Sequence, residues 1–249
     1  MPRFFIHSDP QDLAANTVVI RGADAHHIAR ALRLAVGDPI TVCDDGGTVY
    51  DCRLTRIRDE EAVCEILARR AGTGESPLVI RLFMAYPKGD KFETVLQKAV
   101  ELGAARITPF ESERCIKRPP AEKQARIAER HAKIAEAAAK QCGRSVIPTV
   151  DTPLSFADAL RAATGADLPL FCYEGKGTQS LRAVLEAHPA PRTVSVLIGA
   201  EGAFSEAEAK AATDAGCIAV GLGERILRCE TAPAYVLSAL SYAYELPRG

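Results

Sequence analysis

Val194–Glu208 reads VSVLIGAEGAFSEAE, and this stretch decides the fold. Its first five residues form a nearly continuous branched apolar run, which is typical of a strand covered on both faces of a sheet. A turn with two glycines follows. Ser205 and Glu208 then have the spacing of a capping box, which starts a helix. The stretch therefore predicts one repeat of an α/β fold: a buried strand, a turn and a helix.

The same alternation continues on both sides of this repeat. Further strands are predicted over Leu78–Ala85, Ile107–Phe110, Leu170–Tyr173 and Ile218–Leu222. Helices are predicted from about Phe92 to Gly103, over Ala121–Gln141, Phe156–Ala163 and Leu181–Ala187, from Ser205 to about Gly216, and over Thr231–Leu246. Strands separated regularly by helices predict a mainly parallel sheet flanked by helices.

The first seventy residues have a different pattern. Short strands are predicted over Arg3–Ile6, Thr17–Arg21, Ile40–Val42, Val49–Ile57 and Ala62–Leu67. Asp24 can cap a helix that runs to about Leu34. Ala71–Pro77 is rich in residues that do not sustain regular structure, and we interpret it as a linker. We therefore expect a small β-rich domain over residues 1–72 and an α/β domain over residues 73–249.

Composition excludes several classes of protein. The chain has 249 residues, of which 47% are hydrophobic and 25% charged, as in ordinary globular proteins. No apolar run approaches the ~20 residues that cross a bilayer, and the N-terminus has no export signal, so we expect a cytoplasmic protein without a membrane partner. The eight cysteines include no C-x-x-C pair, and we expect reduced, mostly buried thiols and no metal site.

The near-zero net charge hides an uneven distribution. Residues 81–144 hold 14 basic and 8 acidic side chains, whereas residues 145–224 hold 5 basic and 10 acidic ones. Regular alternation of Glu with Lys or Arg between Glu122 and Lys140 is typical of a solvated helix face. The remaining cations of this segment lie at the ends of predicted elements, which favours one positive face and a polyanionic partner.

Two turns follow predicted strands where parallel α/β sheets bind ligands. In Gly199–Ser205, two glycines allow close approach of the backbone, and Glu201 can accept hydrogen bonds. This turn is neither a dinucleotide fingerprint nor a phosphate loop, and a purely structural turn explains it equally well. In Val220–Ala232, two arginines, a glutamate and a threonine lie between a buried strand and a helix, which favours a ligand site.

Several motifs, in their order and spacing, resemble the RsmE-type RNA methyltransferases of the SPOUT superfamily along the whole chain. They are HHIxxxLR (26–33), Gly37-Asp38, PKGDK (87–91), QKAxELG (97–103), SERC (112–115), QCGR (141–144), LIGxEG (197–202) and LGxRILRxETA (222–232). The sequence departs from the usual family pattern at Ala200, Ala203, Phe204, Glu224, Cys229 and Pro233.

The resemblance implies a PUA-like β-barrel domain that helps to bind RNA, followed by a parallel sheet tied in a trefoil knot. It implies a homodimer that methylates N3 of a uridine in 16S rRNA, either in naked RNA or in the assembled small ribosomal subunit. S-adenosylmethionine is the implied cofactor. By position in the motifs, it would contact Leu197, Gly199, Glu201, Gly202, Leu222, Gly223, Ile226, Leu227, Thr231 and Ala232.

Methyl transfer to uracil N3 requires removal of a proton and stabilisation of negative charge on the flanking carbonyl oxygens. Arg228 is our candidate for the second role. Glu230 either accepts the proton or orients Arg228, and the sequence leaves both roles open. The expected RNA-binding cations are Arg3, Arg30, Arg33, Lys88, Lys91, Arg114, Lys117 and Arg144.

Two rival functions remain open. A non-catalytic RNA-binding or ribosome assembly protein would retain the fold without turnover, and cofactor binding tests this alternative. A small-molecule enzyme could bind a phosphorylated metabolite at Gly199–Ser205. It predicts no salt-sensitive RNA affinity, and it leaves the basic segment 81–144 unexplained.

Overall fold

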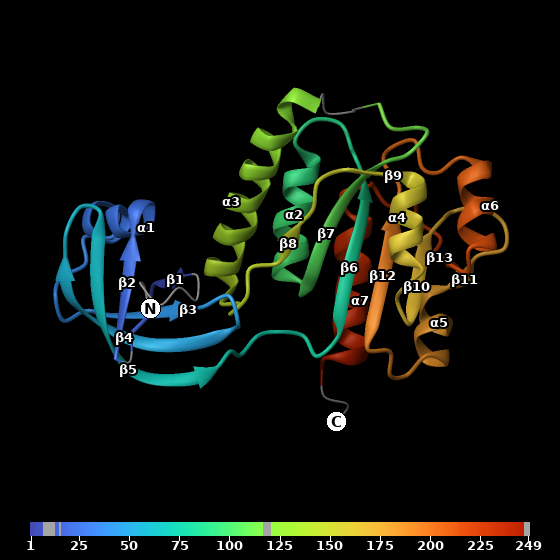
Figure 1. The fold of residues 1–249 in the computed structure, drawn as a ribbon. Coiled ribbons are helices and arrows are strands. Elements are labelled where there is room, and N and C mark those ends of the chain that lie inside the picture. The colour runs from blue at the N-terminus through green and yellow to red at the C-terminus, as the bar shows by residue number, and fades with distance from the viewer. Residues whose placement is uncertain (7–12, 15, 117–120, 247–249) are drawn as a thin grey trace. The chain divides into compact units, whose positions relative to one another are not determined.

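The computed structural model describes residues 1–6, 13, 14, 16–116 and 121–246, and of residue 121 only the backbone. The chain divides into two compact units (Figure 1). Unit 1 consists of Met1–Glu75 and Ala139–Ile147, and unit 2 of Ser76–Ala138 and Pro148–Gly249. The last turn of a long helix thus belongs to the N-terminal unit.

Unit 1 contains a five-stranded sheet in the order β1-β3-β4-β5-β2. Its strands are β1 (Arg3–Phe5), β2 (Thr17–Arg21), β3 (Pro39–Cys43), β4 (Thr48–Ile57) and β5 (Glu61–Ala71). β1 pairs with β3 in parallel, and the other neighbours are antiparallel. The small β-rich domain predicted from alternating residues is confirmed.

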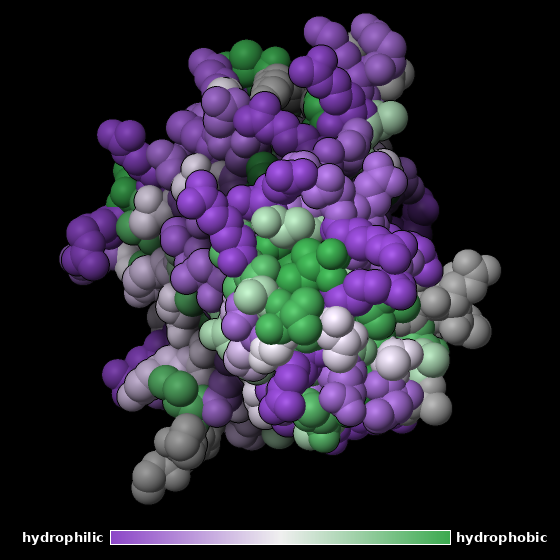
Figure 2. Space-filling model, turned by 90° about the vertical axis from the view of Figure 1, so that its left-hand side faces the viewer, coloured by the Kyte–Doolittle hydropathy of each residue, from purple (hydrophilic) through white to green (hydrophobic). Residues whose placement is uncertain are grey.

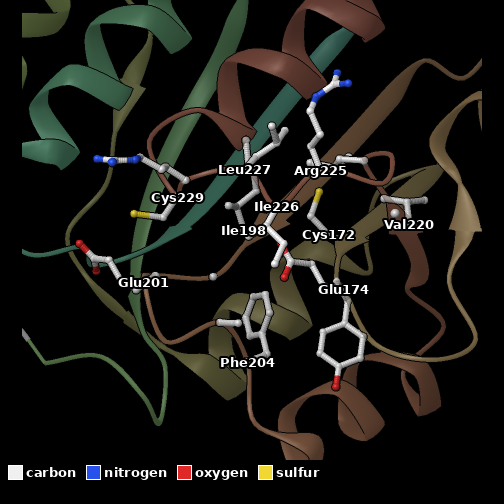
Figure 3. Close-up of a pocket in the computed structure, with 18 of the residues that line it drawn as sticks. Cys172, Glu174, Ile198, Glu201, Phe204, Val220, Arg225, Ile226, Leu227 and Cys229 are labelled. Carbon is white, nitrogen blue, oxygen red and sulfur yellow. The ribbon is translucent and has the colours of Figure 1, made fainter.

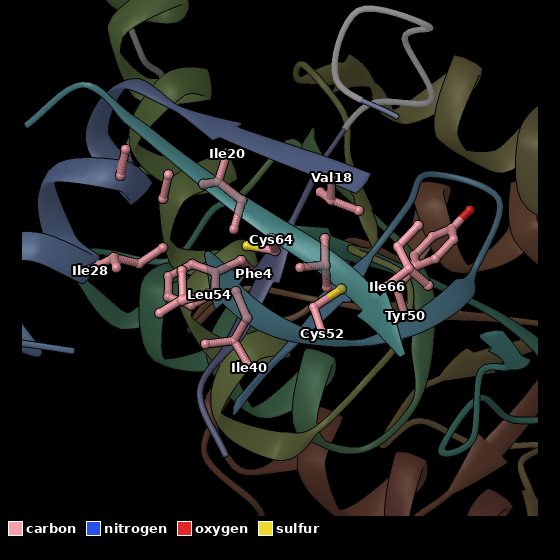
Figure 4. Close-up of a cluster of buried hydrophobic side chains, with 13 residues drawn as sticks. Phe4, Val18, Ile20, Ile28, Ile40, Tyr50, Cys52, Leu54, Cys64 and Ile66 are labelled. Carbon is pink, nitrogen blue, oxygen red and sulfur yellow. The ribbon is translucent and has the colours of Figure 1, made fainter. Parts of the chain in front are cut away.

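One hydrophobic cluster fills unit 1 (Figure 4). Phe4, Ile20 and Ile40 are at most 1% exposed. Cys52 and Cys64 lie in the same cluster, and burial raises the pKa of both thiols to about 12. These cysteines therefore act as small apolar core residues, as expected. All eight cysteines of the chain are free, and six are buried.

The predicted helix after β2 forms, but Asp24 does not cap it. Helix α1 (Gly22–His26) begins earlier, with Arg21 as its N-cap, and continues as the π-helix η1 (His27–Ala31). The Asp24 carboxylate instead accepts hydrogen bonds from Lys140 Nζ at 2.8 and 3.0 Å. Asp24 thus binds Lys140, which is 116 residues away in sequence, and does not cap the helix as its local position would predict.

Unit 2 is built on a parallel sheet in the order β11-β13-β10-β12-β6-β7-β8, with β9 also paired to β7. The longer strands are β6 (Val79–Ala85), β7 (Ala104–Glu111), β10 (Leu168–Cys172), β12 (Thr193–Ile198) and β13 (Ile218–Gly221). Three two-residue strands were not predicted: β8 (Thr149–Val150), β9 (Leu154–Ser155) and β11 (Gln179–Ser180). Such short pairings leave no periodic signal.

Helices flank this sheet, with α7 behind it and α4 in front of it in Figure 1. They are α2 (Lys91–Glu101), η2 (Ala121–Lys123, a 3₁₀ turn), α3 (Gln124–Cys142), α4 (Phe156–Ala163), α5 (Leu181–Ala187), α6 (Glu206–Asp214) and α7 (Ala232–Tyr244). Side chains from Val194 to Ile198 are all buried in the middle of the sheet. The predicted α/β fold is therefore confirmed.

Helix α6 begins with the predicted capping box. The Ser205 side chain accepts from the Glu208 N–H at 3.2 Å, and the Glu208 carboxylate accepts from the Ser205 N–H at 3.0 Å. Glu208 is buried and also accepts from Ser112 Oγ and the Glu113 N–H. The start of α6 is thus tied to the segment that follows β7.

Within the described residues, no helix has the length and apolar character needed to cross a bilayer. The same part of the chain brings together no group of three or more His, Cys, Asp or Glu residues suited to a metal ion.

Candidate functional site

A cavity of about 590 Å³ opens in unit 2 where β10, β12 and β13 end. These three strands are neighbours in the parallel sheet, so the turns that follow them meet at one edge. The walls come from residues 172–178, 198–204 and 220–232, together with Lys91 at the start of α2. Both turns singled out in the sequence therefore line one cavity.

Apolar side chains form much of the lining. Ile198, Val220 and Phe204 are buried, and Ile226 is 83% exposed. Phe204 packs on Phe171 with ring centroids 4.4 Å apart, so its position is set by the core of the sheet. Figure 3 shows Phe204 on the opposite side of the pocket from Leu227. These flat apolar walls suit a ring system.

The turn after β12 folds back closely on itself. A Cβ atom on Gly199 would lie 3.2 Å from backbone atoms of Ala203 and from the Phe204 ring, so a side chain there would push against the turn. Ala203 adopts a φ of 53°, a left-handed conformation that glycine takes more easily. The turn thus holds Glu201 at the rim of the cavity.

Charged groups gather at one side of this cavity. Lys91 Nζ lies 2.9 Å from Glu201 Oε1 and 3.3 Å from Glu230 Oε2. Hydrogen bonding to Glu201 and then to Glu230 raises the pKa of Lys91, although desolvation opposes the shift. Figure 3 shows Cys229 beside Glu201. Glu174 lies at the other side of the pocket.

The two carboxylates beside Lys91 remain ionised at neutral pH. Desolvation raises the pKa of Glu201, but hydrogen bonds from Lys91 and backbone N–H groups outweigh it, so the pKa is lowered. Its own backbone N–H lowers the pKa of Glu230, and Cys229 and Lys91 lower it further against desolvation. Burial, followed by the hydrogen bond to Glu230, raises the pKa of the Cys229 thiol to about 12. This thiol is therefore protonated and a poor nucleophile.

The predicted cofactor residues fall into two groups. Most of them line the cavity: Gly199, Glu201, Leu222, Gly223, Ile226, Leu227 and Ala232. Leu197, Gly202 and Thr231 are not part of its lining. Leu197 is fully buried in β12, and Gly202 packs against Arg114 instead.

The two predicted catalytic residues both line the cavity. Glu230 contacts Lys91 and Cys229. The exposed Arg228 side chain has no hydrogen-bond or ion-pair partner within the described residues. Its guanidinium is therefore available to a substrate, and Glu230 is held by Lys91 and not by Arg228.

Sequence reasoning missed the third wall of the cavity. Cys172, Tyr173, Glu174 and Thr178 line it from the loop after β10. Glu174 is exposed and makes no hydrogen bond or ion pair to the described residues, so its carboxylate can accept hydrogen bonds from a ligand. The available signal was Gly175 and Gly177 directly after a predicted strand, at the same edge as the other two turns.

The predicted RNA-binding cations differ in their exposure and in their contacts with other residues of the protein. Arg33 and Lys88 are exposed. Arg30 donates to Asp59 in an exposed ion pair, Arg114 donates to the Gly202 carbonyl, and Arg3 donates to the Arg144 carbonyl. Lys117 lies outside the described residues.

Two of these cations are engaged in the interior contacts of their own units. The Arg144 side chain is 6% exposed and lies 2.7 Å from Glu75 Oε2. Lys91 is bound between two carboxylates at the cavity. Neither side chain is free to meet a phosphate group without breaking an existing ion pair.

Unit 1 also exposes apolar side chains. Leu32 and Val36, in the segment after η1, are 39% and 63% exposed, and Arg33 lies between them in the chain. Figure 2 shows an apolar patch enclosed by hydrophilic residues on the face that it views. Exposed apolar patches are found at interaction surfaces more often than ordinary protein surface is.

Comparison with known proteins identifies the family. The model of the RNA methyltransferase domain family matches residues 74–241, and that of the RNA methyltransferase PUA domain matches residues 20–67. The chain is 34% identical to ribosomal RNA small subunit methyltransferase E of Bacillus subtilis, over 100% of this chain and 99% of that protein. The protein of that name from Synechocystis is 32% identical, over 95% of this chain and 76% of that protein.

A solved structure agrees with these matches. The crystal structure of ribosomal RNA small subunit methyltransferase E from Neisseria gonorrhoeae, bound to S-adenosyl methionine, is 32% identical with a TM-score of 0.85 and covers 98% of each chain. The resemblance seen in the motifs is thus confirmed. The chain belongs to the ribosomal RNA small subunit methyltransferase E family, with a PUA domain followed by a SPOUT-type methyltransferase domain.

Proposed function

We propose that this protein transfers the methyl group of S-adenosylmethionine to N3 of a uridine in 16S rRNA. The observation that carries the proposal is the cavity at the ends of β10, β12 and β13, built from the motifs shared with this family. A relative that is 32% identical over nearly the whole chain binds S-adenosyl methionine. The relatives named above act on RNA of the small ribosomal subunit.

The cavity suits this cofactor in size and chemistry. Its volume of about 590 Å³ falls within the range of small-molecule sites, about 300–1,000 Å³. Leu222, Ile226 and Leu227 would enclose the adenine ring, and backbone groups of the turns would bind its edge. The free carboxylate of Glu174 would accept hydrogen bonds from hydroxyl or ammonium groups. When bound, S-adenosylmethionine supplies an electrophilic methyl group.

The residues of the chain then have to prepare the nucleophile. We assign to Arg228 the stabilisation of negative charge on a uracil carbonyl oxygen, because its guanidinium is permanently charged and unengaged at the cavity. Glu230 is a weak base because its pKa is lowered. Its contact with Lys91 favours a positioning role, while proton acceptance by Glu230 is the alternative that a variant can test.

RNA binding would use exposed cations of both units together with the half-buried Arg3. Lys88 and Arg114 lie on unit 2, and Arg3, Arg30 and Arg33 on unit 1. We propose residues 1–72 as the RNA-binding domain and residues 73–249 as the methyltransferase domain. Phosphate contacts would position the RNA, and the target uridine must leave any base pair because pairing hides N3. The substrate is cytoplasmic, as 16S rRNA or the assembled subunit.

We further propose a homodimer. Helix α7 exposes Tyr235 and Tyr242, which are 44% and 76% exposed and lie seven positions apart on one helical face. Tyrosines at this exposure on an apolar helix are typical of protein interfaces. The dimer is part of the family resemblance, and α7 directly follows the residues that line the cavity.

Calorimetric titration with S-adenosylmethionine tests the cofactor, and mass spectrometry of 16S rRNA tests the product. We expect binding by the wild-type protein, weaker binding by Glu174→Ala, and none by Gly199→Trp, whose side chain would push against Ala203 and Phe204 and distort the turn at the cavity. Treated rRNA or small subunits from a strain lacking the enzyme should gain one N3-methyluridine. Cofactor binding without methylation of either substrate would favour another RNA target. Salt-sensitive RNA binding without cofactor binding would establish the non-catalytic alternative.

A further inference from the structure

One ammonium group joins three segments at one side of the cavity. Lys91 is the first residue of α2, after the turn that follows β6. Its Nζ binds Glu201, in the turn after β12, at 2.9 Å and Glu230, in the loop after β13, at 3.3 Å. Lys91 Nζ also lies 4.0 Å from Cys229 Sγ. Segments that are more than 100 residues apart in sequence thus meet at this nitrogen.

We propose that Lys91 is a positioning residue, which holds Glu201 and Glu230 together at the rim of the cofactor cavity, and is not a contact to RNA phosphates. This role rests on the proposed methyl transfer, because it concerns the same cavity. Lys91, Glu201 and Glu230 all line that cavity. Displacing either carboxylate would therefore change the shape and charge of the cofactor site.

The two carboxylates depend on Lys91 to different degrees. Glu201 also accepts from the backbone N–H of Lys88, at 3.1 and 3.3 Å, so a second bond ties it to the turn after β6. Glu230 has only the Cys229 thiol as a further side-chain partner within the described residues, at 3.3 Å. Removal of the ammonium group should therefore displace Glu230 more than Glu201.

Loss of the ammonium group would also change the ionisation of the two carboxylates. The side chains of Lys91, Glu201 and Glu230 are 35%, 30% and 23% exposed, so water screens them only in part. Without the ammonium group, two like charges would face each other across its place. Each carboxylate would then disfavour ionisation of the other, and the pKa of Glu230 would rise.

The Lys91 ammonium group is already engaged by protein carboxylates, which argues against its binding an RNA phosphate. An ammonium group has three N–H donors, and two carboxylates already engage this one. The Lys88 side chain, three residues earlier, is exposed and makes no side-chain hydrogen bond or ion pair to the described residues; only its backbone N–H contacts Glu201. Lys88 is thus a matched cation for comparison.

The test separates the two roles by measuring cofactor and RNA affinity independently. For Lys91→Met we expect S-adenosylmethionine affinity without RNA to fall about tenfold, the size of a coupling between contacting charged groups. The salt dependence of RNA affinity should stay as in the wild type. Lys91→Arg should recover most of the cofactor affinity. For Lys88→Met we expect the reverse: unchanged cofactor affinity and a salt slope smaller by about one.

A pH profile provides a readout that simple destabilisation would not move. In single-turnover methyl transfer by Lys91→Met, the acidic limb should shift to higher pH, because the pKa of Glu230 rises. Lys98→Met removes an ion pair with Glu101 from the same helix and should leave the profile unchanged. If Lys91→Met loses its folded circular dichroism spectrum, the less disruptive Lys91→Gln and Glu230→Gln are compared with their double variant, whose effects should be non-additive.

The inference fails if Lys91→Met lowers the salt slope as Lys88→Met does and binds the cofactor normally. It also fails if the effects of Lys91→Gln and Glu230→Gln simply add. Absence of cofactor binding by the wild-type protein would instead overturn the proposed function itself, so the two failures are distinguishable.

Discussion

Arg114 packs directly against Gly202. Arg114 Nη1 donates to the Gly202 carbonyl oxygen at 3.2 Å, and a Cβ atom added to Gly202 would lie 2.9 Å from Arg114 Cβ and 3.2 Å from the Arg114 carbonyl. The segment after β7 and the turn after β12 thus touch where only a hydrogen atom fits. Gly202 therefore serves the packing of the turn, although it does not line the cavity.

Gly202→Ala should destabilise the protein, because the added methyl group meets a Cβ atom and backbone rather than a movable side-chain end. Overpacking of this kind costs about 1–3 kcal/mol, which the free energy of unfolding in urea would reveal. Gly165→Ala is the matched control, because its Cβ would lie at an ordinary 3.6 Å from the Ala162 carbonyl oxygen. Equal stability of the two variants would contradict the packing role of Gly202.

Ala203→Gly should have the opposite effect. Ala203 has a φ of 53°, a left-handed conformation that costs an alanine about 1–2 kcal/mol. Glycine would remove this cost, but part of the gain is lost because an unfolded chain with glycine has more conformational freedom. We expect a net stabilisation of up to about 1 kcal/mol, seen as a higher melting temperature. Ala207→Gly, inside helix α6, should lower the melting temperature instead. A fall with both variants would show that the left-handed conformation is not strained.

Much of this fold could be predicted from local patterns in the sequence. The apolar run at Val194–Ile198 and the pair Ser205 and Glu208 each encode their structure within a few residues, and both predictions are confirmed. The edge at which β10, β12 and β13 end follows from the parallel sheet, so two walls of the cavity could be predicted.

Contacts between distant residues could not be read in this way. Asp24 is a residue type that caps helices and stands at the start of one, but its carboxylate accepts a hydrogen bond from Lys140 instead. Lys91 lies in a basic segment and was therefore predicted to bind RNA, whereas its two carboxylate partners are 110 and 139 positions later. Glu174 was missed because a single acidic residue between a strand and two glycines has no distinctive local pattern.

Glu75 should make the stability of unit 1 depend on pH. Desolvation raises its pKa, but hydrogen bonds from Arg144 and from the backbone N–H groups of Val146 and Ser145 outweigh it, so the pKa lies below its usual 4.5. The folded state thus binds the proton less tightly than the unfolded state. The stabilisation is complete above about pH 4.5 and is lost as the pH falls through the folded-state pKa.

The measurement compares wild type with Glu75→Gln by urea unfolding from pH 7 to pH 3. The variant should be less stable at pH 7 by about 1.5–3 kcal/mol, the value of hydrogen bonds to a charged group, and the difference should shrink below pH 4.5. Glu129→Gln removes an exposed ion pair with Lys133 and should change stability much less. A difference that stays constant with pH would exclude this linkage.

Tyr242→Glu should convert the proposed dimer into a monomer. A charge at a tyrosine that is 76% exposed does little to the fold of one subunit, but it would be costly inside an apolar interface. Light scattering after size exclusion should give twice 26.7 kDa for the wild type and 26.7 kDa for the variant. Leu67→Glu, on β5 of unit 1, should keep the wild-type mass. A monomeric wild-type protein would overturn the dimer proposal.

Arg228→Met should abolish most turnover without weakening cofactor binding. Its guanidinium is exposed at the cavity and bound to no other described residue, so its removal disturbs little else. Loss of one group that stabilises developing negative charge lowers kcat by about 10²–10³. Arg182→Met is the control, since this arginine lies on α5 outside the cavity lining, in an exposed ion pair with Glu186. Near-normal turnover by Arg228→Met would remove Arg228 from the mechanism. A parallel loss of cofactor affinity would make it a binding residue instead, because the effect would then already exist before methyl transfer.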